Sequence, residues 1–134
     1  MLTAETYIRV RYGEVDRMGY VYYGNYPLYY ESARTEMLRK FGLSYLQMED
    51  DGIILPVMDM HIEYLAPALY DDLLTIKTKL IKYPAVRLIF NYEIYNETRE
   101  LLNKASTTLV FADATTKKPR KAPYYFLNRV KEFF

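Results

Sequence analysis

Two carboxylates, Glu14 and Asp16, stand two residues apart in a glycine-punctuated stretch that ends just before a predicted helix. A helix N-terminus offers backbone N–H groups without partners and a partial positive charge, which together can stabilise an oxyanion. A neighbouring carboxylate can activate water or attack a carbonyl carbon directly. Composition alone, however, favours Asp16 as a residue that caps a turn. Glu14 would either raise the pKa of Asp16 by like-charge repulsion or, as we favour, be a solvated loop acid.

The inventory of reactive side chains argues against several other mechanisms. The chain has no cysteine and one histidine, His61, so we expect no thiol nucleophile, no disulfide and no zinc site. The sequence contains neither G-x-x-x-x-G-K nor G-x-G-x-x-G, the glycine-rich motifs that bind nucleotide phosphates. A Ser-His-Asp triad would need His61, and no serine stands in a nucleophile-elbow context. The expected reaction therefore uses no metal and no cofactor.

Two further clusters of polar residues have simpler structural interpretations. Asp59, His61 and Glu63 share one face of a predicted strand, but the opposite row is the apolar one. We therefore expect this face to meet solvent or another subunit. Glu31 and Arg34 are three apart on a predicted helix and can pair there, which favours a structural role over a catalytic one.

The elements on either side of Asp16 are a strand and a long helix. Residues 5–12 alternate in polarity, as in a half-buried strand, and residues 13–24 form a loop. A helix is predicted over 26–41, with Asn25 as its N-cap and Pro27 in its first turn. In the strand, the residues predicted to face inward are Thr6, Ile8, Val10 and Tyr12. In the helix, they are Tyr26, Tyr30, Ala33, Met37 and Phe41.

The rest of the chain changes to a period of two and predicts four more strands. Their apolar rows are Met58 to Ala66, Leu74 to Leu80, Val86 to Ile94 and Ala105 to Phe111. Short helices are expected at 44–50 and from about 124, and 115–123 is a basic, irregular segment. The fold class is α+β, a five-stranded antiparallel sheet wrapped around one helix. Its open face and long edges would be covered by self-association.

Length and charge narrow the class of protein. A chain of 134 residues predicts a single domain over 1–134. The net charge of +1 gives no global sign of nucleic-acid or anionic-membrane binding. No apolar run approaches the ~18 residues of a membrane span, and the N-terminus does not read as a signal peptide. We therefore expect a cytoplasmic protein.

The helix-entry segment resembles the signature of the 4-hydroxybenzoyl-CoA thioesterase family, near the branch of Tol-Pal-associated acyl-CoA thioesterases. The resembling residues are Asp16-x-x-Gly19-x-Val21-Tyr22-Tyr23-x-Asn25-Tyr26, Tyr30-Glu31-x-Ala33-Arg34, the upstream segment from Arg9, and Tyr64 to Asp72. The resemblance covers about residues 5–127. It implies a hotdog fold, thioester hydrolysis and Asp16 as the essential carboxylate. It also implies a homodimer with a continuous sheet, often doubled to a homotetramer, with active sites at the subunit interface.

On this basis Asp16 is the expected general base or nucleophile. Backbone N–H groups near Tyr23 and Gly24 would polarise the thioester carbonyl. Many relatives in the Tol-Pal-associated branch carry histidine where this chain has Tyr23, and a neutral tyrosine is a poor base at pH ~7. The substrate would be contacted by Gly19, Val21, Tyr22 and Tyr26, with Arg87, Lys117 and Lys118 as candidates for the CoA phosphates.

Three alternatives remain open from the sequence. Acyl carrier protein can replace CoA as the donor, since both present the acyl group on a phosphopantetheine arm. A hotdog hydratase usually needs a histidine beside a carboxylate near the helix, and this loop has none. A non-catalytic acyl-binding protein on the same fold is the third, and the presence of Asp16 argues against it.

Overall fold

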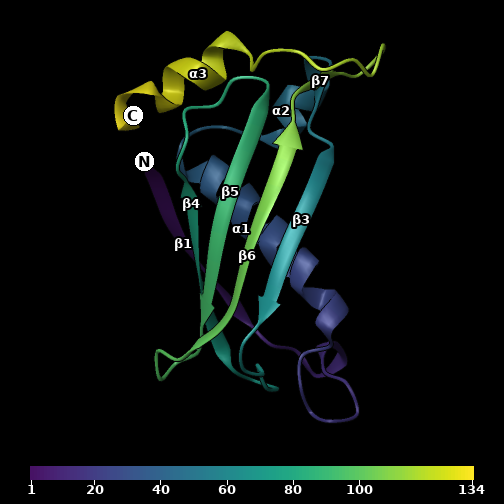
Figure 1. Cartoon of the computed structure of the whole chain (residues 1–134), viewed down its shortest axis with the longest axis vertical. Coiled ribbons are helices and arrows are strands. Elements are labelled where there is room, and N and C mark those ends of the chain that lie inside the picture. Colours follow the sequence, from purple (N-terminus) through teal and green to yellow (C-terminus); the bar gives the residue numbers. More distant parts are fainter.

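A computed structural model describes residues 1–134. It contains a five-stranded antiparallel sheet in the order β1-β4-β5-β6-β3, with helix α1 lying across one face (Figure 1). The bounds are β1 Leu2–Arg9, α1 Tyr26–Lys40, β3 Val57–Tyr64, β4 Leu73–Leu80, β5 Arg87–Tyr95 and β6 Leu101–Val110. The predicted fold class is confirmed. None of the helices has the length and apolar character that crossing a membrane requires.

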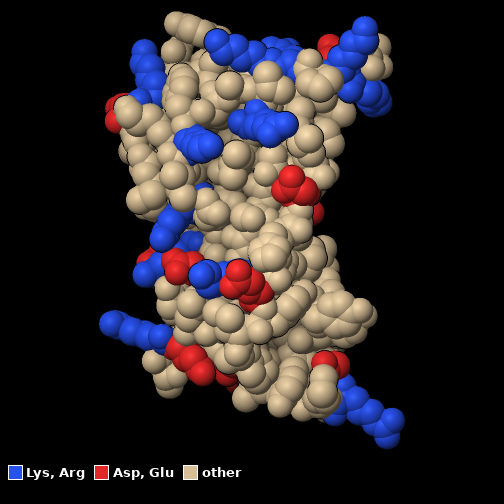
Figure 2. Space-filling view, in the orientation of Figure 1, with Lys and Arg blue, Asp and Glu red and all other residues tan.

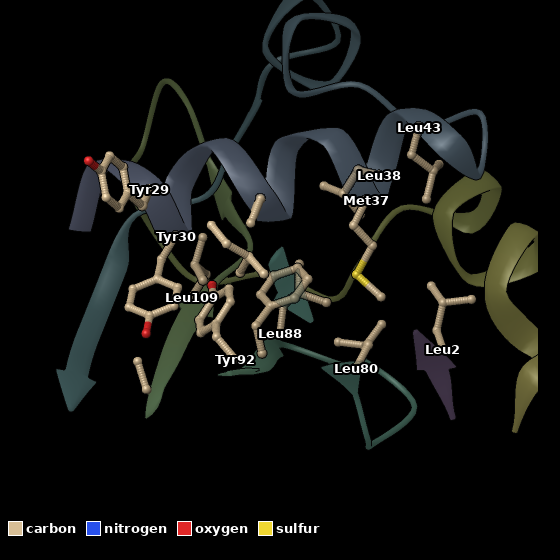
Figure 3. Packing of buried hydrophobic residues seen from close by; sticks show 14 of the residues in the cluster. Leu2, Tyr29, Tyr30, Met37, Leu38, Leu43, Leu80, Leu88, Tyr92 and Leu109 are labelled. Atoms are coloured by element: carbon tan, nitrogen blue, oxygen red, sulfur yellow. The ribbon is translucent and has the colours of Figure 1, made fainter. Parts of the chain in front are cut away.

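Helix α1 forms because one of its faces is apolar along its whole length. Tyr26, Tyr30, Ala33 and Met37 are buried as predicted and belong to the core cluster. Figure 3 shows Tyr30 and Met37 facing the sheet residues Leu88, Tyr92 and Leu109. Pro27 lies in the first turn, where its missing N–H costs no helical bond. Asn25 occupies the N-cap position as predicted, but its side chain caps no helical N–H. It donates instead to the Glu14 carbonyl oxygen at 2.8 Å.

The first strand is shifted towards the N-terminus relative to the prediction of 5–12. Its alternation holds from Leu2, which is buried, to Val10, which is also buried. After Val10 the chain leaves the sheet and forms a 3₁₀ turn, η1 (Tyr12–Glu14). Tyr12 is therefore 77% exposed and does not face the core. The alternating pattern continued past the point where the backbone leaves the sheet.

Strand β3 contains a bulge that the alternating pattern did not reveal. Val57 pairs with Leu109 but Asp59 pairs with the adjacent Thr108, so one residue is extra on β3. The bulge turns Val57 to the helix side of the sheet, whereas strict alternation from Asp59 and His61 predicts that Val57 lies on their side. The prediction from alternation is therefore wrong at Val57.

The outer face of the sheet is polar rather than apolar. One register row crosses all five strands in the order Glu5, Lys77, Glu93, Lys104, Glu63, with alternating charge. Figure 2 shows acidic and basic side chains intermingled across the middle of this face. Opposite charges on neighbouring strands attract one another and are well hydrated. This face therefore does not need an apolar cover.

Smaller elements complete the fold. Helix α2 (Tyr45–Asp50) begins at Ser44, whose side chain accepts from the Gln47 N–H. Strand β2 (Ile53–Ile54) pairs with β7 (Ala112–Asp113), a contact the sequence analysis missed because two residues show no period. Helix α3 (Tyr124–Val130) begins where predicted, after the irregular basic segment.

Candidate active site

Asp16 lies in a tight turn between β1 and α1. Val15 and Val21 form a bridge across it, and Tyr20 forms another with Leu69. The Asp16 N–H donates to the Tyr20 carbonyl at 2.7 Å, and the Gly19 N–H donates to the Asp16 carbonyl at 3.0 Å. Gly19 has φ +82°, which suits a residue without a Cβ. The turn therefore holds the Asp16 backbone in a defined position.

The Asp16 carboxylate is oriented through only one of its oxygens. Oδ1 accepts from the backbone N–H groups of Met18, at 2.9 Å, and Tyr20, at 3.2 Å. Oδ2 accepts no hydrogen bond. Asp16 is thus both the turn-capping residue of the simpler interpretation and a carboxylate with one oxygen free for chemistry.

Asp16 forms part of the wall of a pocket of about 340 Å³ beside the start of α1. The other lining residues are mainly apolar or aromatic: Met18, Tyr20, Val21, Tyr23, Tyr26, Tyr64, Leu65, Ala66 and Pro67. A largely apolar lining strengthens the electrostatic interaction between a carboxylate in the pocket wall and a polar atom brought beside it. The pocket can therefore receive an apolar group whose reactive carbon lies next to Asp16.

Tyrosine rings form one wall of the pocket. The rings of Tyr26 and Tyr64 meet edge to face with centroids 5.4 Å apart, and those of Tyr23 and Tyr64 at 6.4 Å. The Tyr64 hydroxyl donates to the Tyr23 carbonyl at 3.1 Å, which ties the end of β3 to the helix entry. Burial raises the pKa of Tyr26 and of Tyr64 above the ordinary value. These side chains are therefore neutral hydrogen-bonding groups at physiological pH.

Free backbone N–H groups lie just before α1. A 3₁₀ turn, η2 (Tyr23–Asn25), leads directly into the helix. Its first bond runs from the Asn25 N–H to the Tyr22 carbonyl, which leaves the N–H groups of Tyr23 and Gly24 without acceptors. These are the two groups expected from the sequence, but the 3₁₀ turn adds three residues before the predicted start of the helix at Tyr26.

Glu14 holds the loop against α1. Its carboxylate accepts from the Arg11 backbone N–H at 2.8 Å, from the Arg11 guanidinium at 3.1 Å and from the Tyr29 hydroxyl at 3.0 Å. Burial acts to raise the pKa of Glu14, but the bonds from Arg11 and Tyr29 hold that pKa below its usual value. Glu14 is therefore a tied, partly buried residue, and the favoured interpretation as a solvated loop acid is wrong.

The predicted site residues fall into two groups. Val21, Tyr23 and Tyr26 line the pocket with Asp16, whereas Tyr22 lies beside it with its ring 4.8 Å from that of Tyr23. Arg87, Lys117 and Lys118 lie at the end of the molecule opposite to Asp16. Arg87 begins β5 and pairs with Val110, the last residue of β6, and Lys118 bonds to Asp113 of β7 (Figure 1). Within one chain the structure does not bring these bases to Asp16.

The pocket also contains residues that the sequence analysis did not name as site residues. Met18 and Tyr20 belong to the motif around Asp16, and Tyr64 to Pro67 belong to the second resembling segment. Because these residues lie in the segments that resemble the thioesterase family, the resemblance could have identified them as site residues. His61 lies on the outer face, with Nε2 3.5 Å from Glu63 Oε1 and both side chains exposed. The structural interpretation of that cluster therefore holds.

Comparisons with known proteins show to which family the chain belongs. Residues 10–131 match the family model of the thioesterase-like superfamily. The acyl-CoA thioester hydrolase YbgC of Escherichia coli is 36% identical over 125 residues, 93% of each chain. The putative acyl-CoA thioesterase YneP of Bacillus subtilis is 36% identical over 84% of this chain and 81% of its own. A crystal structure of a DHNA-CoA thioesterase from Staphylococcus aureus superposes with a TM-score of 0.91 and 38% identity, over 99% of this chain and 89% of its own.

Proposed function

Because the chain belongs to the thioesterase-like superfamily, we propose that Asp16 is the carboxylate with which it hydrolyses acyl-CoA thioesters. One observation carries the assignment. Asp16 lines a largely apolar pocket and has one oxygen, Oδ2, without a hydrogen bond, and unpaired N–H groups of Tyr23 and Gly24 lie at the nearby helix entry. A nucleophile or base and an oxyanion-stabilising group are the two parts that acyl transfer requires.

The reaction follows from these parts. The thioester carbonyl oxygen accepts from the N–H groups of Tyr23 and Gly24, which stabilise the negative charge that develops on it. Asp16 either takes a proton from water as the water oxygen attacks the carbonyl carbon, or attacks that carbon itself. The C–S bond then breaks, and the CoA sulfur leaves as a thiolate that takes up a proton. In the second route, water hydrolyses the acyl-aspartate intermediate. Neither route uses a cofactor.

Tyr23 takes the place that histidine holds in many relatives of the Tol-Pal-associated branch. A neutral phenol can donate a hydrogen bond but does not accept a proton at pH ~7. Tyr23 lines the pocket, so its hydroxyl is positioned to orient water or substrate. In this proposal Asp16 works without a histidine partner.

Replacing Asp16 by asparagine tests the assignment. Asparagine keeps an acceptor oxygen for the Met18 and Tyr20 N–H groups but removes the charge, so kcat is expected to fall by about 10²–10⁴-fold. Asp72→Asn is the matched control, because Asp72 Oδ2 caps a turn by accepting from the Leu69 N–H at 2.9 Å. Thiol release from acyl-CoA and the unfolding midpoint are measured for both variants. Near-wild-type hydrolysis by Asp16→Asn would leave Asp16 only a turn cap.

We also propose a homodimer formed through β3. This strand is a sheet edge paired only to β6, and Val57, Met58, Tyr64 and Leu65 on or beside it are half exposed or more. A long edge strand with exposed apolar side chains needs a partner, and a second copy supplies one by antiparallel pairing. At the other edge, the Lys40 ammonium donates to the Glu5 carbonyl of β1. The two edges are therefore not equivalent, and β3 is the better interface.

Such a dimer accounts for the position of the basic residues. Antiparallel pairing of two β3 strands reverses one chain relative to the other, so the β7 end of one subunit lies beside the Asp16 end of its partner. Lys and Arg side chains gather at the β7 end (Figure 2). Arg87, Lys117 and Lys118 would then bind the CoA phosphates at the partner's pocket. A dimer of dimers, acyl carrier protein as an alternative donor, and a cytoplasmic location stay predictions.

A further inference from the structure

Arg34 is a buried cation without a carboxylate partner. It projects from α1 and is 6% exposed, yet no acid lies within ion-pair distance of it. Its Nε donates to the Tyr45 hydroxyl at 3.2 Å. Burial acts to raise the pKa of Tyr45 to about 12, so Tyr45 is neutral and does not offset the charge. The Tyr92 hydroxyl is a second neighbour of the guanidinium. A guanidinium removed from water needs acceptor oxygens, and two phenols do not supply enough of them for its five N–H groups.

A second pocket, of about 410 Å³, lies against Arg34. Its lining combines α1 and α2 with the start of β3: Glu31, Arg34, Thr35, Tyr45, Glu49, Leu55, Val57 and Leu109. Leu55, Val57 and Leu109 provide an apolar wall, and the exposed acids Glu31 and Glu49 stand at its rim. The expected pairing of Glu31 with Arg34 is absent from the ion pairs of the structure. The pocket thus has an apolar side and a polar end.

The two pockets lie at opposite ends of β3 and on the same face of the sheet. The pocket with Asp16 is bounded by Tyr64, the last residue of β3, and by Tyr26 of α1. The pocket with Arg34 is bounded by Val57, the first residue of β3, and also by α1. In a β3–β3 dimer the two-fold axis runs between the two strands, perpendicular to the sheet, so it reverses the direction of the strand and preserves the face. It therefore carries the Asp16 pocket of one subunit towards the Arg34 pocket of the other.

We propose that Arg34 of one subunit binds a hydroxyl group at the far end of the acyl chain that is hydrolysed at the partner subunit's Asp16. The inference rests on the proposed function and on the β3 dimer, and it goes further by assigning an acyl-specificity residue in trans. Asp16 and the N–H groups of Tyr23 and Gly24 act on the thioester carbon. Arg34 contacts only the opposite end of the acyl group.

The chemistry of the second pocket favours a hydroxyl over other groups. A hydroxyl oxygen accepts from the guanidinium of Arg34 and can donate to the carboxylate of Glu31 or Glu49. A plain alkyl end gives Arg34 no acceptor. A terminal carboxylate would accept from Arg34 but meet the negative charge of Glu31 and Glu49. We therefore expect the enzyme to prefer acyl chains that end in a hydroxyl over acyl chains that end in a carboxylate or an alkyl group.

Matched acyl-CoA sets test this preference. Hexanoyl-, octanoyl- and decanoyl-CoA are compared with the same acyl groups carrying a hydroxyl or a carboxylate on the terminal carbon. For at least one length, the wild type should give a higher kcat/KM with the hydroxyl. Arg34→Met should reduce that hydroxyl-to-alkyl ratio by about tenfold or more, the effect of one hydrogen bond to a charged group. Arg39→Met, an exposed arginine of the same helix paired with Glu36, should leave the ratio unchanged.

Purified mixed dimers test the trans arrangement. A dimer of one Asp16→Asn chain and one Arg34→Met chain contains one site with both Asp16 and the partner's Arg34 intact. It should recover the wild-type hydroxyl preference, whereas the Arg34→Met homodimer should lack it and the Asp16→Asn homodimer should be nearly inactive. A mixed dimer without the preference would overturn the inference but leave the hydrolytic role of Asp16 intact.

A surface variant covers the case in which Arg34→Met does not fold. Glu31→Gln combined with Glu49→Gln changes two exposed rim acids and should raise kcat/KM for the carboxylate-ended substrate relative to the hydroxyl-ended one. A wild type that prefers alkyl or carboxylate ends at every length, or a ratio unchanged in this double variant, contradicts the proposal.

Discussion

At the scale of single residues, the two oxygens of the Asp16 carboxylate have different environments. As in an Asx-type turn, one oxygen, Oδ1, accepts from two backbone N–H groups, while Oδ2 stays free. The turn thus holds the carboxylate in place and leaves one of its oxygens without a hydrogen-bond partner. This division lets one residue be held rigidly by the fold and still take part in chemistry.

The Tyr23 hydroxyl should matter less than the Asp16 charge. We expect Tyr23→Phe to lower kcat by no more than about tenfold, because a neutral phenol orients but does not take a proton. Tyr12→Phe is the control, since Tyr12 is 77% exposed and lies outside the pocket. Steady-state hydrolysis of one acyl-CoA measures both variants. A loss in Tyr23→Phe as large as that in Asp16→Asn would give Tyr23 a direct part in proton transfer.

At the scale of elements, the loop and α1 are joined through Glu14. Its side chain bonds to Arg11 and Tyr29, and its carbonyl accepts from Asn25 Nδ2 and the Tyr22 N–H. These contacts position the turn that carries Asp16 relative to the free N–H groups at the helix entry. The distance between the two halves of the site thus depends on a residue that does no chemistry itself.

Stability should depend on pH through Glu14. Its folded-state pKa is held below the unfolded value of about 4.3, so its contribution is present above that pH and is lost as pH falls through the folded pKa. We expect Glu14→Gln to reduce the unfolding free energy by about 1–3 kcal/mol at about pH 7 and by much less at about pH 3. Urea unfolding at both pH values measures this, with the exposed Glu132→Gln as control. An equal loss at both values would show that the charge of Glu14 is not involved.

At the scale of the whole molecule, the sheet has one polar face and, at β3, one edge with exposed apolar side chains. The charged row from Glu5 to Glu63 suits the outer face to water, whereas the half-exposed apolar side chains of β3 suit that edge to a second copy. Pairing there would bring together pockets that are separate in one chain. The oligomer would then be part of the active site.

A charge placed on the β3 edge should separate the subunits. Met58→Asp replaces a side chain that is 57% exposed at the bulge, and the symmetry of the dimer would place the change on both subunits. Each buried methionine is worth about 1.5–3 kcal/mol, so the dimer should weaken by at least about tenfold and activity should fall with it. Sedimentation across a dilution series measures both this variant and Tyr7→Asp, on the opposite edge. A dimer unaffected by Met58→Asp would place the interface elsewhere.

The sequence by itself determined the features that depend on local spacing. The inward face of α1, the order of the long strands and the motif around Asp16 all follow from residues within a few positions of one another. Only the tertiary structure decided the rest. The bulge that turns Val57 inward, the β2–β7 pair, the bonds of Glu14 to Tyr29 and the burial of Arg34 each depend on segments distant in sequence. Such contacts produce no periodic pattern in the sequence, because each one depends on a residue in a distant segment of the chain.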